Sequence, residues 1–140
     1  MKYLTRNEDK MTSPVYMFMS HFYTTLRDNG IEAVKRWTSK KNINIFKKRY
    51  VFIPIHGDLH WSLFLIVNPG NFGKDEEAFG LFHLDSLGLH NSEKIYKNIS
   101  GWLKNEYFRI YPNNPQTQTL KYPKSFIFPK GMSINISYIL

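Results

Sequence analysis

Cysteine is absent from all 140 residues of this chain. Its absence excludes disulfide bonds and metal sites built on thiolate ligands. It also excludes a cysteine nucleophile, and no serine or threonine lies in a setting that marks a substitute nucleophile. We therefore expect that the chain, as written, forms no covalent acyl intermediate.

Long apolar stretches are also lacking. No apolar run approaches the roughly 20 residues that a membrane-spanning helix needs. The start of the chain, residues 1–9, lacks the apolar core of a secretory signal peptide. We therefore expect a nuclear or cytoplasmic protein that does not bind membranes.

Acidic residues are scarce, because 11 of them stand against 19 lysines and arginines, which leaves a net charge of +8. Such a charge suits an acidic partner. The basic residues are nevertheless spread along the chain, with clusters only at Lys40-Lys41 and Lys47-Lys48-Arg49. The aromatic residues fall in apolar runs, without a basic stacking platform for nucleic acid. We expect a solvated basic surface and no nucleic-acid binding.

The size of the chain allows one hydrophobic core, because 140 residues with 42% hydrophobic side chains cannot fill two domains. Clear periodic patterns occupy residues 1–110, which we expect to form one domain or part of one. Residues 111–140 are expected to form a divergent tail with no clear period. Four prolines punctuate this tail: Pro112, Pro115, Pro123 and Pro129.

Helical signals come first along the chain. Ser13-Pro14 reads as a helix cap followed by proline in the first turn, which predicts an aromatic-rich helix that ends near Gly30. A second, short helix is predicted over residues 31–37. Near the other end, Asn91 or Ser92 can cap an amphipathic helix. Its apolar residues recur at three- and four-residue spacing and can lie on a sheet: Ile95, Ile99, Trp102 and Leu103.

Three strands are predicted between these helices. Residues 50–55, 61–67 and 78–85 are runs of strand length, rich in β-branched and aromatic residues. The run 61–67 is apolar on both faces, which is typical of a central strand that is covered on both sides.

A histidine and an aspartate mark the ends of two of these runs. If residues 61–67 and 78–85 form an antiparallel hairpin, the register that aligns the apolar runs places His60 opposite Asp85. Opposed side chains on one face lie about 4.5–5.5 Å apart at Cβ, so the carboxylate could accept a hydrogen bond from the imidazole. Such a pair can act as an oriented general base. Taken without a family, a histidine and an aspartate at such strand ends are more often surface residues than catalytic residues.

A metal site is an alternative for the same region. Alternate strand positions share one face, so His56, Asp58, His60, His83 and Asp85 could converge on an ion. Nitrogen and oxygen ligands would suit zinc or another transition metal. The sequence Pro54-Ile-His56-Gly57 indicates a strand end that turns His56 and Asp58 away from the pair, which disfavours this alternative.

Several short motifs resemble the ubiquitin-like-protein-specific cysteine proteases, the SUMO (sentrin) protease family. They are His60-Trp61-Ser62 after the strand 51–55, the break Asn68-Pro-Gly70, and His83-Leu-Asp85-Ser-Leu87 before an amphipathic helix. The resemblance covers roughly residues 14–110. It implies an α+β, papain-like cysteine protease fold, incomplete here, with helices packed on a central antiparallel sheet and no cofactor.

The resemblance also implies roles for three residues. His60 would be the general base and Asp85 the acid that orients it. Trp61 would line the narrow tunnel that holds the Gly-Gly tail of SUMO, although a plain core aromatic is equally open for this position. The implied partners are SUMO or another ubiquitin-like protein and its conjugates.

Two parts of the family pattern are missing from this sequence. Gln116 and Gln118 lie near the place of the family's oxyanion-hole glutamine, but no Asp-Cys-Gly motif follows. The Trp-Leu-Asn-Asp type motif that supplies the opposite tunnel wall is also absent. We therefore expect a chain truncated at both ends and inactive alone. A non-catalytic module that still binds a ubiquitin-like protein remains the other hypothesis.

Overall fold

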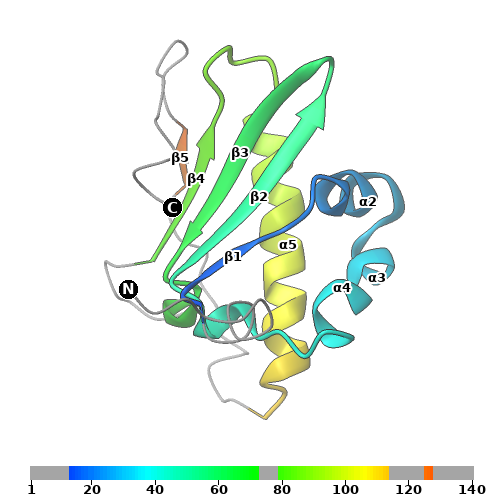
Figure 1. Ribbon diagram of the computed structural model, residues 1–140, viewed down its shortest axis with the longest axis vertical. Coiled ribbons are helices and arrows are strands. Elements are labelled where there is room, and N and C mark those ends of the chain that lie inside the picture. The colour runs from blue at the N-terminus through cyan, green and yellow to red at the C-terminus, as the bar shows by residue number, and fades with distance from the viewer. Residues whose placement is uncertain (1–12, 73–78, 114–124, 128–140) are drawn as a thin grey trace.

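The computed structural model describes residues 13–72, 79–113 and 125–127 (Figure 1). In chain order the elements are β1 (Val15–Met17), α2 (His21–Asn29), α3 (Ile31–Val34), α4 (Arg36–Ser39), the 3-10 helix η1 (Ile45–Lys47), β2 (Tyr50–Gly57), β3 (His60–Val67), the 3-10 helix η2 (Pro69–Asn71), β4 (Gly80–Leu84), α5 (Ser92–Ile110) and β5 (Ser125–Ile127).

A five-stranded sheet in the order β1-β2-β3-β4-β5 forms one layer of the fold. The strands β2, β3 and β4 are antiparallel, whereas β1 and β5 run parallel to their neighbours. The predicted antiparallel centre is therefore confirmed, and parallel strands flank it. The three predicted strands correspond to β2, β3 and β4, except that Ala78 lies outside the described residues.

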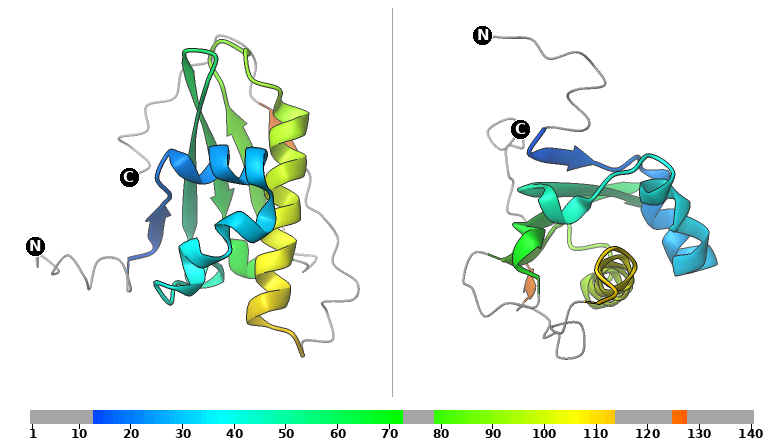
Figure 2. Two further views of the ribbon diagram at one scale, coloured as in Figure 1. Left: turned by 90° about the vertical axis from the view of Figure 1, so that its right-hand side faces the viewer. Right: turned by 90° about the horizontal axis from the view of Figure 1, so that it is seen from below.

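The helices cover one face of this sheet, as the two views of Figure 2 show. An aromatic cluster fills the space between the layers, where Phe18 stacks on Phe22 and both rings meet Trp102 of α5 edge-on. On the opposite face, Leu63 and Leu65 of β3 are buried in a second, smaller cluster. Burial on both faces confirms β3 as the central strand.

The helix α5 begins where the sequence predicted. The Asn91 side chain accepts a hydrogen bond from the backbone N–H of Lys94, at 3.1 Å, and thereby caps the first turn. The apolar stripe of α5 is buried against the sheet, as predicted: Ile95, Ile99, Trp102 and Leu103. Among the described residues, no helix is both long and apolar enough to span a lipid bilayer.

The predicted start of the first helix is wrong. Residues Val15–Met17 form β1, which pairs with Tyr50–Phe52 of β2, and α2 begins only at His21. The Ser13 hydroxyl does accept a hydrogen bond from the Val15 N–H, at 3.2 Å, so a local turn exists, but no helix follows it. Pairing with the sheet overrides the local signal, and the β-branched and aromatic side chains of Val15 and Tyr16 suit a strand.

The second predicted helix, over residues 31–37, is replaced by the two short helices α3 and α4. A buried carboxylate fastens α4 to α5. Glu106 of α5 is 1% exposed and accepts hydrogen bonds from the Thr38 hydroxyl, at 2.9 Å, and from the Arg109 guanidinium. Because a buried charge is costly unless it is paired, these partners decide whether Glu106 stabilises the fold.

We predict that Glu106→Ala lowers the free energy of unfolding by about 2–3 kcal/mol, because the buried Thr38 hydroxyl and Arg109 lose their acceptor. Urea denaturation of the purified chain measures this loss. Glu32→Ala is the control, since Glu32 forms only an exposed pair with Lys35 and should change stability by less than about 0.5 kcal/mol. Equal effects of the two variants would contradict the prediction.

Candidate active site

The site lies next to a tight turn at one end of the sheet. Asp58 and Leu59 link β2 to β3, and both have positive φ angles, 54° and 58°. Two successive residues of this kind are typical of the two-residue hairpin turns whose twist matches that of the strands. The Leu59 side chain is 99% exposed. The turn places His60 at the first position of β3, directly opposite Gly57.

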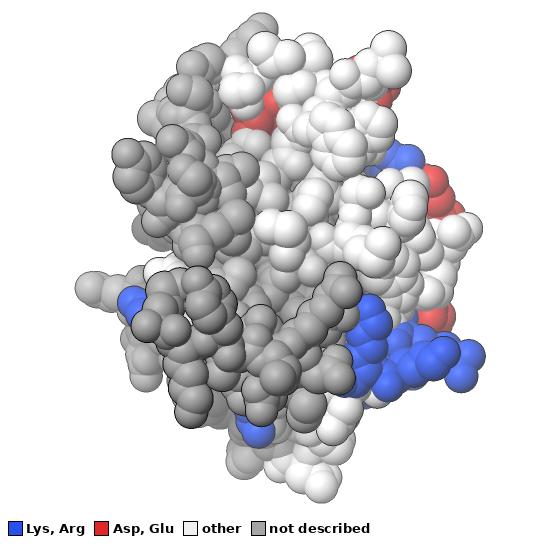
Figure 3. Space-filling view, viewed as in Figure 1, with Lys and Arg blue, Asp and Glu red and all other residues white. Residues whose placement is uncertain are grey.

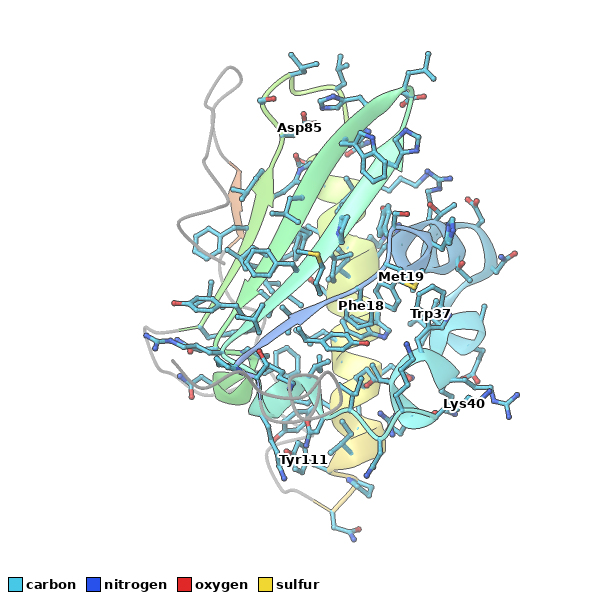
Figure 4. The ribbon with its side chains drawn as sticks, viewed as in Figure 1. Phe18, Met19, Trp37, Lys40, Asp85 and Tyr111 are labelled. Atoms are coloured by element: carbon cyan, nitrogen blue, oxygen red, sulfur yellow. The ribbon has the colours of Figure 1, made fainter. Side chains whose placement is uncertain are left out.

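His60 and Asp85 meet at this end of the sheet, where Figure 4 labels Asp85. The His60 Nε2 atom lies 2.6 Å from the Asp85 Oδ1 atom. Asp85 directly follows β4 and is 6% exposed, and the His60 side chain is 11% exposed. The predicted contact between these two residues, on neighbouring antiparallel strands, is confirmed.

The predicted register of these two strands is wrong by two residues. It placed Val67 opposite Ala78, whereas Val67 pairs with Gly80 and Leu63 pairs with Leu84. Side chains alternate between the faces with a period of two, so a shift by two residues keeps every side chain on its predicted face. For this reason His60 and Asp85 still share a face, and they meet diagonally.

The Asp85 carboxylate accepts hydrogen bonds from three backbone N–H groups as well as from His60. Its Oδ1 atom accepts from Leu87 and Gly88, at 3.2 and 3.1 Å, and its Oδ2 atom accepts from His90, at 2.9 Å. Burial alone raises the pKa of Asp85, but the hydrogen bonds from His90, His60 and Leu87 outweigh burial. The pKa falls from 3.8 to about 2, so Asp85 is ionised at neutral pH.

The ionised Asp85 carboxylate determines which ring nitrogen of His60 carries the proton. A carboxylate only accepts hydrogen bonds, so the His60 Nε2 atom carries a proton, and this N–H group donates a hydrogen bond to Asp85. Within residues 13–72, 79–113 and 125–127, the Nδ1 atom of His60 has no hydrogen-bond partner. It is the nitrogen that can accept a proton from an incoming nucleophile.

Neither nearby hydroxyl is presented to His60 as a nucleophile. Ser62 is buried, and its Oγ atom is bonded to the rings of His90 and His83, at 2.6 and 3.0 Å. Ser86 is exposed in the loop after Asp85. The described residues therefore hold an oriented histidine–aspartate pair, and neither of these hydroxyls is paired with it.

Trp61 is 57% exposed and stacks on His56, with ring centroids 4.3 Å apart. It projects from the opposite face of β3 to that of His60, because the two residues are adjacent in a strand. The alternative of a plain core aromatic is therefore wrong. A role of Trp61 in binding substrate stays a prediction.

The five residues of the metal alternative do not converge. Among the described residues, the only group with ligand atoms close enough to hold an ion is His60, Asp85 and His90. All three already make hydrogen bonds: His60 to Asp85, and the two ring nitrogens of His90 to Ser62 and to the Gly57 carbonyl. His56 instead stacks on Trp61.

No sequence pattern pointed to His90. It lies in the loop between β4 and α5, and its ring centroid is 4.9 Å from that of His60. The one usable signal was the segment Asp85-Ser-Leu-Gly88, because aspartate side chains often accept from backbone N–H groups a few residues ahead in a turn. Gly88 has a positive φ of 63°, as such a turn requires.

Comparison with known proteins agrees with this geometry. Residues 1–124 match the sequence model described as "Ulp1 protease family, C-terminal catalytic domain". The chain belongs to this family.

Relatives of known sequence lie in the same family. Over 111 residues, the chain is 38% identical to ubiquitin-like-specific protease 1D of Arabidopsis thaliana. This alignment covers 72% of this chain and 18% of that protein. It is 33% identical over 101 residues to human sentrin-specific protease 2, covering 72% and 15% of the two chains. The chain thus spans about a fifth or less of these relatives.

Solved structures share the fold. A crystal structure of a de-sumoylating protease aligns with a TM-score of 0.65 at 27% identity and covers 96% of this chain and 48% of that chain. The C-terminal Ulp1 protease domain in complex with Smt3, the yeast ortholog of SUMO, aligns with a TM-score of 0.61 at 21% identity, covering 89% and 52%. The resemblance and the α+β, papain-like fold are confirmed, and the chain spans about half of each solved domain.

The family match extends beyond the predicted boundary at residue 110. Residues Ser125–Ile127 also pair with β4 as the edge strand β5. The division into residues 1–110 and 111–140 stays a prediction, and Gln116 and Gln118 lie outside the described residues.

We predict that Asp85→Asn destabilises this Ulp1-family chain by about 2 kcal/mol at pH 7. The folded-state pKa of Asp85 is depressed, so its contribution is present above about pH 4 and is lost as the pH falls towards 2. Urea denaturation at pH 7 and below pH 3 should therefore show the difference between wild type and variant shrinking in acid. The exposed Asp28, in Asp28→Asn, is the control and should change stability little at either pH. A difference that does not depend on pH would contradict the assignment.

Proposed function

We propose that this chain supplies the general base, the orienting acid and part of the substrate surface of a protease that cleaves after the Gly-Gly tail of a ubiquitin-like protein. The contact of 2.6 Å between His60 and Asp85, with the His60 Nδ1 atom left to accept a proton, carries the proposal. Membership of the Ulp1 protease family supports it.

In the proposed reaction, His60 takes a proton from a cysteine thiol through its Nδ1 atom. The thiolate attacks the carbonyl carbon of the terminal glycine, and the imidazolium then protonates the leaving amine. Asp85 keeps His60 in the required tautomer and stabilises the imidazolium. Water activated by His60 hydrolyses the thioester and releases the free carboxylate of the tail.

This chain has no cysteine, so the proposal assigns it the base and not the nucleophile. A non-catalytic role is the second candidate: the same surface would bind a ubiquitin-like protein without cleaving it. The exposed Trp61, beside a base without a nucleophile, is the observation that favours this candidate.

The proposed partner is SUMO or a related ubiquitin-like protein, with its conjugates. Exposed apolar side chains occur at the dyad end of the sheet, as a docking surface requires. Three lie in loops, and Trp61 lies near the start of β3: Leu59, Trp61, Leu87 and Leu89. In the view of Figure 3 the lysines and arginines gather at the lower right, whereas the upper part, where the dyad end lies, is largely uncharged. A Gly-Gly tail suits a narrow passage, because glycine has no side chain to exclude.

We further propose a nuclear or cytoplasmic location. The cytosol and the nucleus keep thiols reduced, which suits a reaction that depends on a thiol nucleophile. Imaging of a fluorescent fusion in cells of the source organism tests this, and a signal confined to a secretory compartment would contradict it.

We predict weak binding of a SUMO-like protein that Trp61→Ala weakens at least about 10-fold, as expected for an exposed aromatic anchor. Titration of the isotopically labelled chain by NMR measures the affinity. Added salt should weaken binding further, because the chain carries a charge of +8.

Phe108→Ala is the matched control, since Phe108 is also an exposed aromatic, 37% accessible, but lies near the far end of α5. It should leave the affinity unchanged. Equal losses in the two variants, or no shifts at low or moderate salt, would count against the proposed surface.

We predict that the chain alone cleaves neither SUMO precursors nor SUMO conjugates. A longer chain in which this sequence is joined to the tryptophan-motif helix and the Asp-Cys-Gly segment of a complete relative should cleave them. In that longer chain, His60→Ala should reduce the rate at least about 100-fold, because the general base is lost.

His21→Ala is the control, because His21 is an exposed histidine at the start of α2 and belongs neither to the dyad nor to the surface around Trp61. It should leave the rate within about threefold of the parent, whereas a general base contributes 100-fold or more. Cleavage by the unmodified chain, or by the longer chain after His60→Ala, would refute the assignment of the base.

A further inference from the structure

Behind the dyad, a chain of hydrogen bonds links four side chains and one carbonyl group. The Ser92 Oγ atom lies 2.6 Å from the His83 Nδ1 atom, and the His83 Nε2 atom lies 3.0 Å from the Ser62 Oγ atom. The Ser62 Oγ atom lies 2.6 Å from the His90 Nδ1 atom, and the His90 Nε2 atom lies 2.9 Å from the Gly57 carbonyl oxygen.

With neutral histidine rings, the carbonyl at one end fixes the direction of every hydrogen bond in this series. A carbonyl oxygen only accepts, so the His90 Nε2 atom must donate to Gly57, and the Nδ1 atom of a neutral His90 then accepts from the Ser62 hydroxyl. The single Ser62 proton is thereby used, so the His83 Nε2 atom must donate to Ser62. The His83 Nδ1 atom accepts from Ser92. Burial lowers the pKa of His83, in agreement with a neutral ring.

This series of hydrogen bonds links the strands next to His60 and Asp85 with the start of α5. Gly57 ends β2 and precedes the turn that presents His60, whereas Ser62 lies two residues after His60 in β3. At the other end, Ser92 is the first residue of α5. His90 stands in the middle, and its backbone N–H donates to the Asp85 Oδ2 atom. His90 therefore contacts the last residue of β2, the strand that carries His60 and the Asp85 carboxylate.

We propose that His90 is a positioning residue for the His60–Asp85 dyad. The inference rests on the proposed function, because it concerns the same general base. Both ring nitrogens of His90 are committed to Ser62 and Gly57, so the ring does not exchange protons with a substrate. Its role is to hold the loop whose backbone N–H groups donate to Asp85 at a fixed distance from the hairpin that carries His60. The His90 ring also packs beside the His60 ring, which restricts rotation of His60.

The test observes His60 itself, by NMR of the histidine rings in the full 140-residue chain. In the wild type, the His60 Nε2–H proton should resonate at low field and exchange slowly with water, because it donates to a carboxylate. The His83 and His90 rings should both be neutral Nε2–H tautomers. His90→Ala and Ser62→Ala should each speed exchange of the His60 ring proton at least about 10-fold, as local opening becomes easier.

His90→Gln is the rescue variant, because its side-chain amide offers one donor group and one acceptor. It should slow the exchange of the His60 proton relative to His90→Ala. His56→Ala is the control, since this exposed histidine lies on the same hairpin but outside this series of hydrogen bonds. It should leave the His60 signal unchanged. Backbone amide exchange at Ile99, in the middle of α5, reports whether the core of a variant remains folded.

The outcomes separate the two proposals. A wild type without a protected His60 ring proton would overturn the dyad and, with it, the proposed function. A wild type with that proton, together with unchanged exchange in Ser62→Ala and His90→Ala, would overturn only the role of His90. If His90→Ala loses protection at Ile99, Ser62→Ala decides alone, because a hydroxyl is removed without a change in the loop. Faster exchange of the His60 proton with an intact core supports the inference.

Discussion

The site depends on the hydrogen bonds that the buried Asp85 carboxylate accepts. Burial alone would favour the neutral acid, yet the backbone N–H groups of His90 and Leu87, with the His60 ring, lower its pKa to about 2, and the Gly88 N–H also donates to the carboxylate. Three of these four donors are main-chain groups of one loop, so the fold of the loop creates the charge. That charge in turn selects the tautomer of His60 and leaves its Nδ1 atom available.

The sheet provides the rigid frame for this loop. The strands β3 and β4 are the centre and its neighbour in a five-stranded sheet, and both have buried side chains. His60 is the first residue of β3 and Asp85 directly follows β4, so the sheet fixes their backbones close together while both side chains stay largely buried. A pair held this way needs little reorganisation when a proton moves, which is what a general base requires.

Strong local patterns allowed much of this to be predicted from the sequence. The elements β2, β3, β4 and α5 carry long apolar runs or stripes, and the pairing of His60 with Asp85 survived a register error because two-residue shifts preserve the face. The three-residue strand β1 was missed because its stability comes from pairing with β2, more than thirty residues away. His90 was missed because a histidine in a polar loop has no periodicity, and its contacts arise only when three elements meet.

The arrangement of the side chains around His60 does not require a nucleophile. Every bond that orients His60 comes from residues of this chain, and the hydrogen-bonded series from Ser92 to Gly57 is complete without a thiol. A base assembled in advance leaves one geometric requirement for a catalytic segment, namely that it brings a sulfur atom to the Nδ1 side of His60. Such a segment would gain nucleophilicity from the existing imidazole, because the thiolate forms by proton transfer to a ring whose other nitrogen already faces a carboxylate. In the proposed reaction, the fold of this chain thus provides the orientation of the base before any thiol arrives.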